Sequence, residues 1–432
     1  MIIFLFSLAY NLLAMPLLWC ITRLIAFRIP KLRTRLRGIS ATYQELRTLH
    51  STTSAQFHHK QRIWFHAASA GEFEQIKPVI EEIRSRRPDI WIIVTMYSAS
   101  GYTAHRHYTM CDMICYLPDD SWYGVRSFLR LVQPHCAIFS RYDLWWNMAH
   151  TLHRSAIPLY VINATLNPRA VQNPFGAWYI SALYSHCTAV YTAGESETAL
   201  FHAIGLGTTI HTSADTRIDH ILRRVASAQN DTVFAPLRQG QFTLVVGSSW
   251  SADEERIIPA VEKLRAEGFG ISLVLVPHEP TAEHIHHLQT IVPYAQCLSH
   301  IEHTLDTYHT APEHASMIID SIGKLLRLYA IADAAYIGGG FGFCVHSVLE
   351  PAGYGLALAS GPNIALARDA IALHKEGALT LIHTTDDVYR WLKILLTDPQ
   401  KKAYAEKTAH AYITSKRGSA QSIADQLLLE IR

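Results

Sequence analysis

The stretch that decides the fold is Trp64–Ile80, which reads WFHAASAGEFEQIKPVI. Its apolar residues up to Ala67 form a short run typical of a buried strand, and the small residues that follow end this strand. From Ile76 onward, apolar side chains recur at helical spacing, which predicts a helix packed on a sheet. We expect this helix to begin near Lys77, with Pro78 at its tolerated first position. The stretch therefore predicts one strand–turn–helix unit of a parallel α/β sheet.

The same alternation of apolar runs and amphipathic stretches fills most of the chain. Buried strands are predicted at residues 63–67, 90–95, 135–139, 158–162 and 189–193, and again after Arg217 at residues 242–246, 271–276 and 334–337. A helix is predicted at residues 251–267, where Ser251 and Glu254 are spaced as a capping box. At 432 residues the chain is long for one domain. We predict an N-terminal α/β domain at residues 23–212 and a C-terminal one at residues 213–432, whose last helix can pack back on the first domain.

The N-terminus has the composition of a membrane anchor. Residues 1–22 contain no charged side chain and are about as long as a helix that crosses a bilayer. Basic residues follow at positions 23–37, whereas a secretory signal peptide carries its positive charge before the apolar core. We predict an anchor at residues 1–22, with the rest of the chain on the cytoplasmic face and the basic cluster near anionic lipids of the inner leaflet. Pro16 leaves open a helix that only dips into one leaflet.

Composition excludes several classes of protein. Hydrophobic residues make up 49% of the chain and charged residues 17%, which excludes a disordered protein. The net charge of +2 gives no general attraction to nucleic acid. The seven cysteines are odd in number and scattered, as in reduced cytosolic proteins. Neither Cys111 with Cys115 nor the histidines near His278 match a common zinc-ligand spacing, so we predict no metal and no cofactor.

Glu72 follows the first strand and its small-residue turn, where backbone amides point outward. Gly71 allows close approach of a ligand, and a carboxylate at this point can accept a proton from a substrate hydroxyl. The alternative is a glutamate that only stabilises the positive end of the helix dipole. Position alone favours the second interpretation.

A second candidate site follows the strand at residues 334–337. The glycines of the turn, Gly338, Gly339 and Gly340, could bring backbone N–H groups to a phosphate. His346 and Glu350 are four residues apart, so we expect them to share one face of a helix, with the carboxylate able to bind both hydroxyls of a ribose. The alternative is a surface pair at helical spacing.

In this order, the motifs resemble those of the 3-deoxy-D-manno-octulosonic acid (Kdo) transferases, which add Kdo to a lipid A precursor. Residues 64–80 resemble the family's W-x-H-A-x-S-x-G-E…P-L-I, and HSVLEPAGYG at residues 346–355 resembles its H-N-x-L-E-P-A-x-x-G. Further similar segments are YLPDD at residues 116–120, VINATL at 161–166, GSSWSADEE at 247–255 and the run into the glycine turn at 318–342. The resemblance covers almost the whole chain.

The resemblance implies the GT-B glycosyltransferase fold, in which two Rossmann-like domains face a central cleft. It implies inverting transfer of Kdo from CMP-Kdo to a lipid A precursor in lipopolysaccharide biosynthesis, at the cytoplasmic face of the inner membrane, with Glu72 as the catalytic base. The donor-binding residues that it implies are Arg217, Ser248, Ser249, His278, Gly338, Gly339, Gly340, His346, Ser347 and Glu350. The acceptor-binding residues are Ser69, Gly71, Arg141 and Asp143. Arg217 and the glycine-turn amides would stabilise the leaving phosphate without a metal or cofactor.

Three departures from the family's motifs mark a divergent member. Arg141 stands in place of the first of two paired acids, Arg217 in place of a lysine, and Ser347 in place of an asparagine. These changes leave open the details of acceptor binding and the number of Kdo units added.

Three other functions stay open. The first is another GT-B glycosyltransferase that uses a different nucleotide sugar, which would release UDP or GDP instead of CMP. The second is a nucleotide-sugar epimerase of related fold, which needs neither a membrane anchor nor a lipid acceptor. The third is a membrane-bound scaffold without activity, and the presence of Glu72 argues against it.

Overall fold

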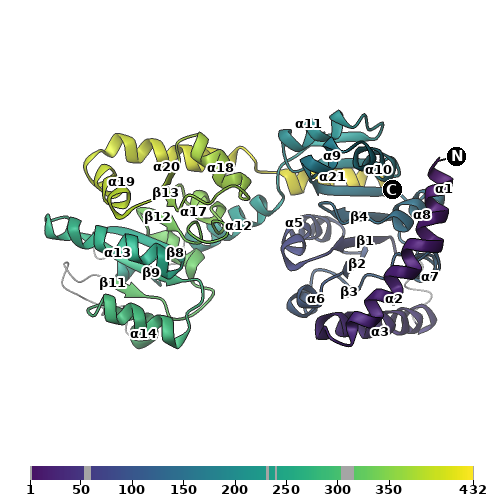
Figure 1. Ribbon diagram of the computed structural model, residues 1–432, viewed down its shortest axis with the longest axis horizontal. Helices are drawn as coiled ribbons and strands as arrows, with labels where there is room; N and C mark the ends of the chain where they lie inside the picture. Colours follow the sequence, from purple (N-terminus) through teal and green to yellow (C-terminus); the bar gives the residue numbers. More distant parts are fainter. Residues whose placement is uncertain (1, 53–59, 230–232, 239–240, 303–315, 432) are drawn as a thin grey trace. The chain divides into compact units, whose positions relative to one another are not determined.

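The computed structural model describes residues 2–52, 60–229, 233–238, 241–302 and 316–431. The chain divides into two compact units, residues 1–219 with 418–432 and residues 220–417. Each unit is built on one seven-stranded sheet whose paired strands run parallel (Figure 1). The predicted two-domain α/β fold is thus confirmed.

The sheet of the first unit has the strand order β3-β2-β1-β4-β5-β6-β7. The strand order reverses between β1 and β4, and ligands of such sheets bind beyond the carboxyl ends of the strands at this point. The strands are β1 (Arg62–Ala67), β2 (Trp91–Met96), β3 (Met113–Tyr116), β4 (Cys136–Ser140), β5 (Leu159–Ala164), β6 (Ala189–Thr192) and β7 (Thr209–Thr212). The helices after the N-terminal segment are α3 (Pro30–Thr52), α5 (Ala70–Arg86), α6 (Ala99–His105), α7 (Trp122–Val132), α8 (Trp146–Arg154), α9 (Pro168–Gln172), α10 (Pro174–Tyr184), α11 (Glu195–Ala203), α12 (Arg217–Gln229) and α21 (Ser419–Glu430).

The second unit repeats this topology with the strand order β10-β11-β9-β8-β12-β13-β14, so its switch point lies between β8 and β12. The strands are β8 (Phe242–Ser249), β9 (Ile271–Pro277), β10 (Gln296–Cys297), β11 (Ser316–Ile318), β12 (Ala334–Ile337), β13 (Ala357–Ser360) and β14 (Leu379–Leu381). The helices are η2 (Ala235–Leu237), α13 (Ser251–Ala266), α14 (Ala282–Ile291), α15 (Leu298–Ile301), α16 (Leu325–Leu328), η5 (Tyr329–Ile331), α17 (Leu349–Gly353), α18 (Arg368–Lys375), α19 (Thr385–Thr397) and α20 (Pro399–Thr414).

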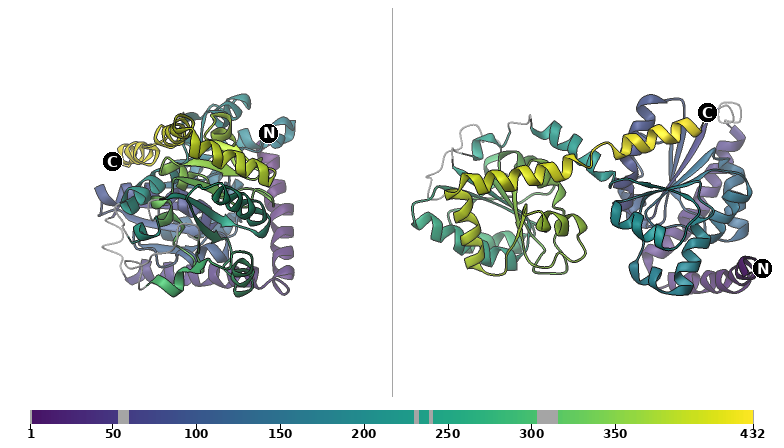
Figure 2. Two further views of the ribbon diagram at one scale, coloured as in Figure 1. Left: turned by 90° about the vertical axis from the view of Figure 1, so that its left-hand side faces the viewer. Right: turned by 90° about the horizontal axis from the view of Figure 1, so that it is seen from above.

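β1 is buried along its whole length because helices cover both faces of the sheet. On one face, Trp64 packs against Phe128 of α7, with the ring centroids 4.9 Å apart. On the other face, Phe65 belongs to a core cluster with Phe73 of α5 and Ile423 of α21. Figure 2 shows α21, the last helix of the chain, in yellow. Burial on both faces is the reason why the strands of this sheet read as continuous apolar runs.

The expected start of the first helix is wrong. α5 begins at Ala70 rather than near Lys77, because Ser69 accepts a hydrogen bond from the Glu72 N–H and caps the helix there. Pro78 therefore lies inside the helix. Glu72 moves from a loop into the first helical turn.

The predicted capping box of α13 is also wrong. The helix is preceded by Trp250, whose N–H donates to the Asp253 carboxylate at 3.0 Å. Ser251 is already the first helical residue. Glu254 is fully buried and accepts a hydrogen bond from the Ser249 hydroxyl. The acid that accepts the backbone N–H at the start of the helix is therefore Asp253.

Residues 2–26 form one continuous helix of three parts, α1 (Ile2–Ala9), the π-helical turn η1 (Tyr10–Ala14) and α2 (Met15–Ala26). Pro16 lacks an N–H group and its ring needs space in the preceding turn, which the wider π turn provides. Within the described ranges, this is the one helix long and apolar enough to cross a membrane by length and composition.

Candidate active site

The first candidate site lies at the carboxyl end of β1, where the chain turns into α5. The Glu72 N–H donates to Ser69 Oγ at 3.4 Å, and Glu72 Oε2 accepts the Ala68 N–H at 2.6 Å. This reciprocal arrangement is close to a capping box, so Glu72 does stabilise the helix start. Only Oε2 is used in this way. Oε1 makes no hydrogen bond with any residue that the structure describes, which leaves it for a ligand.

The surroundings of Glu72 favour a proton acceptor. The residue is 4% exposed, and burial is the main reason why its pKa is raised above the ordinary value. The Ala68 N–H opposes this shift, Asp143 adds to it, and His66 and Arg141 oppose it. A carboxylate with a raised pKa is a stronger base than an exposed one, as general-base catalysis requires.

His66 belongs to the same site, although the sequence analysis did not single it out. It is fully buried in β1, with Nε2 2.8 Å from Asp143 Oδ2 and Nδ1 2.9 Å from Thr95 Oγ1. These contacts fix the position of the Asp143 carboxylate. The signal that could have revealed it is a histidine inside an otherwise apolar strand, one residue before the strand ends.

Arg141 follows β4 in a left-handed backbone conformation with a φ of 63°, which is uncommon for a residue other than glycine. Its Nε is buried and has no hydrogen-bond partner among the described residues. The predicted acceptor-binding residues Ser69, Gly71, Arg141 and Asp143 thus lie with Glu72 where β1 and β4 end side by side.

Arg217 does not belong to the unit that carries the glycine turn. It begins α12 in the first unit, where Nε and Nη2 donate to Asp215 Oδ2 at 3.0 and 2.7 Å. Burial disfavours ionised Asp215, but the Arg217 guanidinium outweighs burial and holds the pKa of this carboxyl below its usual value. The Arg217 side chain is 41% exposed, so the ion pair does not enclose it.

Close contacts with neighbouring backbone require glycine in the turn after β12. A Cβ atom at Gly338 would lie 2.2 Å from the Ser248 carbonyl oxygen, and one at Gly340 would lie 2.7 Å from the backbone of Gly361. Gly339 has a φ of +90°, and its N–H donates to the Asp253 carboxylate at 3.1 Å. The turn is therefore held tightly against β8 and the start of α13, and the Gly339 amide is already occupied.

His346 lies in the loop before α17, so the expectation that it shares a helix face with Glu350 is wrong. The His346 N–H donates to the Gly338 carbonyl oxygen at 3.0 Å, which holds this part of the chain extended against the turn. The His346 ring stacks on that of His278, with centroids 4.1 Å apart, and its Nε2 accepts the Trp250 Nε1–H at 3.2 Å. Burial, with a smaller effect of His278, lowers the pKa of His346 and favours the neutral ring.

Glu350 lies in the first turn of α17 and bonds Arg224 of α12 at 3.2 Å. Burial raises the pKa of Glu350, and Arg224 lowers it. Ser347 is exposed between His346 and the helix. The structure thus brings His278 and His346 against the glycine turn, whereas Glu350 is engaged by an arginine of its own unit.

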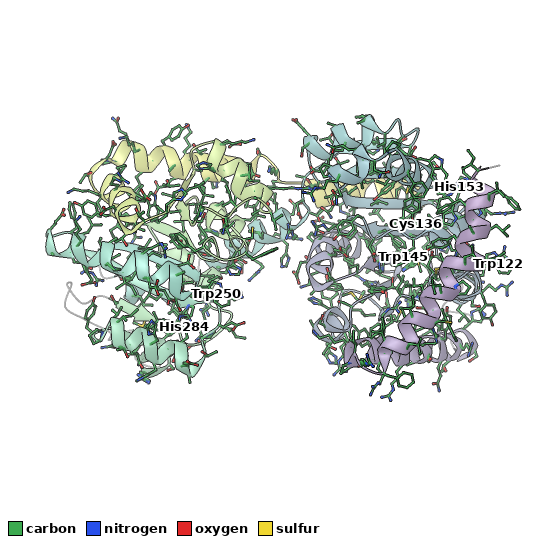
Figure 3. All side chains as sticks on the ribbon, viewed as in Figure 1. Trp122, Cys136, Trp145, His153, Trp250 and His284 are labelled. Atoms are coloured by element: carbon green, nitrogen blue, oxygen red, sulfur yellow. The ribbon has the colours of Figure 1, made fainter. Side chains whose placement is uncertain are left out.

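The Ser249 hydroxyl is buried and committed to the protein interior, because it donates to Glu254 Oε1 at 2.6 Å. Glu254 Oε2 in turn lies 2.8 Å from the Nε2 atom of His284. His284 is labelled in Figure 3. Ser248 has a left-handed φ of 54° and is part of the tight approach to the glycine turn. In the ranges that the structure describes, no group of three or more His, Cys, Asp or Glu side chains is arranged to hold a metal ion.

Comparisons with known proteins agree with this architecture. A family model described as 3-Deoxy-D-manno-octulosonic-acid transferase (kdotransferase) matches residues 37–220. The 3-deoxy-D-manno-octulosonic acid transferase of Haemophilus influenzae is 23% identical over 96% of both chains, and that of Chlamydophila psittaci is 27% identical over 80% of both chains. Among solved structures, a UDP-GlcNAc 2-epimerase from Neisseria meningitidis bound to UDP-GlcNAc superimposes with a TM-score of 0.58 at 13% identity. It covers 85% of this chain and 100% of its own, and at this identity it supports the fold alone.

The matches to transferases span most of the chain, and the matched family model includes the segment around Glu72. The low identities agree with the substitutions at Arg141, Arg217 and Ser347. Over most of its length the chain is therefore similar, at low identity, to the 3-deoxy-D-manno-octulosonic acid transferases.

Proposed function

We propose that the protein transfers Kdo from CMP-Kdo to a lipid A precursor, with inversion at the anomeric carbon, on the cytoplasmic face of the inner membrane. The observation that carries this proposal is Glu72, a buried carboxylate with a raised pKa at the switch point of the first sheet, in a chain similar to the Kdo transferases.

In the proposed reaction, a sugar hydroxyl of the acceptor donates its proton to Glu72 as its oxygen attacks the anomeric carbon of Kdo. The bond between this carbon and the phosphate oxygen breaks, and CMP leaves with the electron pair. Glu72 Oε1 is the atom that takes the proton, because Oε2 is held by the Ala68 N–H. Arg141 and the Asp143–His66 pair position the acceptor sugar beside this oxygen.

The donor is proposed to bind to the second unit. His278 and His346 lie against the glycine turn and offer ring nitrogens to a phosphate or the Kdo carboxylate, with Ser347 and Ser248 at the edge. Glu350 would bind the ribose hydroxyls, and Arg224, which bonds its carboxylate at 3.2 Å, opposes the rise in pKa that burial causes. A role of Arg217 toward the phosphate rests on the resemblance alone, since this residue belongs to the first unit.

The test is to incubate the full-length protein in detergent with CMP-Kdo and a lipid A precursor, and to measure the product masses and the nucleotide released. A mass increase of one or more Kdo residues, with release of an equal amount of CMP, is expected. A parallel reaction with UDP-sugars is the control. Turnover of a UDP-sugar in place of CMP-Kdo would contradict the donor assignment, and isomerisation of a free nucleotide sugar would favour the epimerase.

A further inference from the structure

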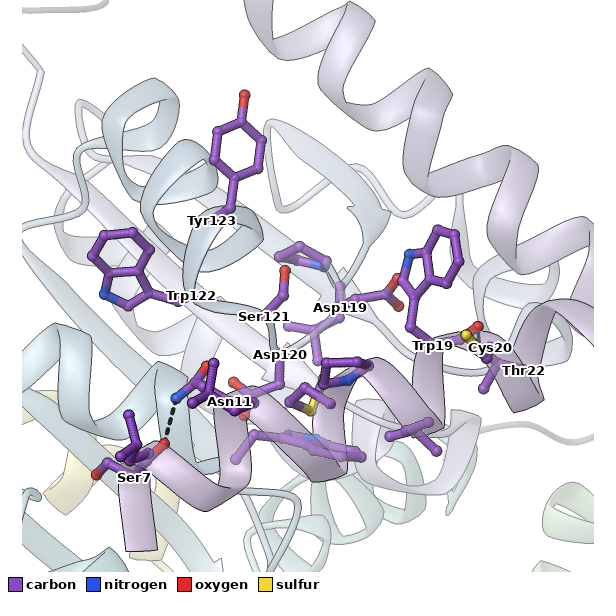
Figure 4. A pocket seen from close by; sticks show the side chains of 18 of the residues that line it. Ser7, Asn11, Trp19, Cys20, Thr22, Asp119, Asp120, Ser121, Trp122 and Tyr123 are labelled. Atoms are coloured by element: carbon purple, nitrogen blue, oxygen red, sulfur yellow. Dashed lines mark hydrogen bonds between the residues drawn. The ribbon is translucent and has the colours of Figure 1, made fainter. Parts of the chain in front are cut away.

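We propose that the N-terminal helix and the loop after β3 form a pocket for a fatty acyl chain of the lipid acceptor, an inference that rests on the proposed function. A cavity of about 1010 Å³ lies between residues 4–22 of the helix and residues 117–123 (Figure 4). Its lining is largely aliphatic and aromatic, with Leu8, Leu12 and Trp145 among the contributing side chains. A cavity of this size and composition suits a hydrocarbon chain.

The helix is seated on the first unit through polar contacts, so the cavity is a built feature of this unit. Figure 4 shows the helix stretch with Ser7 and Asn11 facing the loop that carries Asp120. The contacts are Trp146 Nε1–H to Ser7 Oγ at 3.0 Å, Tyr10 OH to Asp120 Oδ2 at 2.8 Å, and the amide exchange between Asn11 and Asn147 at 2.9 and 3.0 Å. A helix that moved away into lipid would leave these groups without partners, at a cost for each.

The outward face of the same helix is apolar and exposed. Leu5, Leu13 and Leu24 are 54%, 70% and 69% exposed. Trp122 and Tyr123, at the rim of the cavity, are 54% and 77% exposed, and such aromatic side chains are typical of the membrane–water interface. The cavity thus adjoins a surface suited to lipid, where acyl chains are the abundant ligand.

Two buried nitrogen atoms of residues that line the cavity indicate which polar group the bound acyl chain carries. Arg35 Nε and Trp145 Nε1 have no hydrogen-bond partner among the described residues. Arg35 is only 5% exposed, and its Nη1 is held by Asp119 at 3.1 Å, so the group cannot swing out to water without breaking this pair. Buried donors without an acceptor are rare in folded proteins. The carbonyl oxygen of the ester or amide that joins an acyl chain to a sugar would satisfy them.

The position of the cavity agrees with an acceptor that presents its sugar to Glu72. Tyr97 directly follows β2, and Trp145 lies two residues after Asp143, so both lining residues stand at the carboxyl edge of the first sheet. Their rings stack, with centroids 6.1 Å apart. An acyl chain bound in this cavity would keep its attached sugar at the edge of the sheet that carries Glu72.

The experiment compares Leu12→Trp with Leu13→Trp. The two leucines are neighbours with similar exposure, 64% and 70%, but only Leu12 lines the cavity. For each variant, KM is measured with an acylated lipid A precursor and with the same phosphorylated disaccharide after removal of its acyl chains. Leu12→Trp is expected to raise the KM ratio of acylated to chain-free acceptor about tenfold, since exclusion of each methylene from an apolar site costs about fourfold in affinity. Leu13→Trp should leave this ratio unchanged.

Equal ratios of KM for acylated to chain-free acceptor in the two variants and the wild type would overturn the proposal of an acyl-chain pocket. A second measurement uses an acceptor with a photoreactive acyl chain, which should label a peptide that contains residues 117–123 or 4–22. Labelling by a photoreactive phospholipid that excess acceptor does not reduce would assign the cavity to a bulk lipid and overturn the proposal. Absence of Kdo transfer to either acceptor by the wild type would instead contradict the proposed function, which keeps the two failures separate.

Discussion

Replacing Glu72 by glutamine separates the two roles of this side chain. Glutamine keeps the shape, and its amide oxygen can accept the Ala68 N–H that Oε2 now accepts at 2.6 Å. The start of α5 should therefore be retained, since glutamine serves in capping boxes as glutamate does. The variant cannot accept a proton, and loss of a general base typically lowers the rate on the order of a hundred- to ten-thousand-fold.

Unlike the rate, the free energy of unfolding at neutral pH should not fall in Glu72→Gln. The raised pKa of Glu72 means that the fold favours its neutral form. The stability that this group contributes is therefore present below its unfolded pKa and is lost as pH rises through the raised folded pKa. At neutral pH, Glu72→Gln should unfold at the same or higher denaturant concentration than the wild type. Glu72→Ala, which leaves the Ala68 N–H without its acceptor, should lose roughly 1–3 kcal/mol.

The assay is the initial rate of CMP release over a pH series, together with denaturant unfolding of each variant. Glu74→Gln is the matched control, because Glu74 lies in the same helix with a side chain that is 35% exposed. In the wild type, kcat/KM should fall as pH drops through the raised pKa of Glu72. Turnover of Glu72→Gln close to that of the Glu74→Gln control would refute the assignment of the base. If Glu72→Gln loses turnover and also loses enough unfolding free energy to account for this loss, Glu72 acts only as a helix cap.

Four further predictions concern the donor, metal independence, the N-terminal helix and Arg141. Glu350→Ala and Arg217→Ala should each weaken CMP binding by roughly 1.5–3 kcal/mol in calorimetric titration, and unchanged affinity in both would place the nucleotide elsewhere. Activity should persist in excess EDTA, and loss that a divalent cation restores would contradict this. Deletion of residues 1–26 should lower the denaturation midpoint of the first unit without changing CMP affinity, since it removes the partners of Asp120 and Asn147; an unchanged midpoint would mean that these contacts do not form. Arg141→Glu should shift the acidic limb of kcat/KM to higher pH, because it places a negative charge where a positive one now lowers the pKa of Glu72; an unmoved limb would contradict that coupling.

The long buried strands could be predicted from sequence, whereas the short ones could not. β1 and β2 are six-residue strands that are mostly apolar and buried along their whole length, and such runs are distinctive. β10, β11 and β14 have three residues or fewer, too few for a periodic pattern. These strands are defined by their neighbours in the sheet, which a local pattern does not contain.

The site residues divide in a similar way. Glu72 could be predicted because a strand end, a small-residue turn and an acid are adjacent in sequence. His66 was missed because its partner Asp143 lies 77 residues away, and only the pairing of β1 with β4 brings them to 2.8 Å. The spacing of His346 and Glu350 suggested a helix. The His346 N–H instead donates to the Gly338 carbonyl oxygen, so His346 lies outside the helix.

The substitution at Arg141 can be understood from the charges around the base. The resemblance places two acids in the family at the turn where this chain has Arg141 and Asp143. Asp143 raises the pKa of Glu72, and a second acid at 141 would raise it further, since like charges nearby disfavour ionisation. Arg141 lowers it instead. His66 holds Asp143 in place at 2.8 Å, so one acid of the pair persists while the other has changed sign. In this chain Arg141 therefore opposes part of the rise in the Glu72 pKa that burial and Asp143 cause, and the change at residue 141 leaves the base and its neighbouring acid in place.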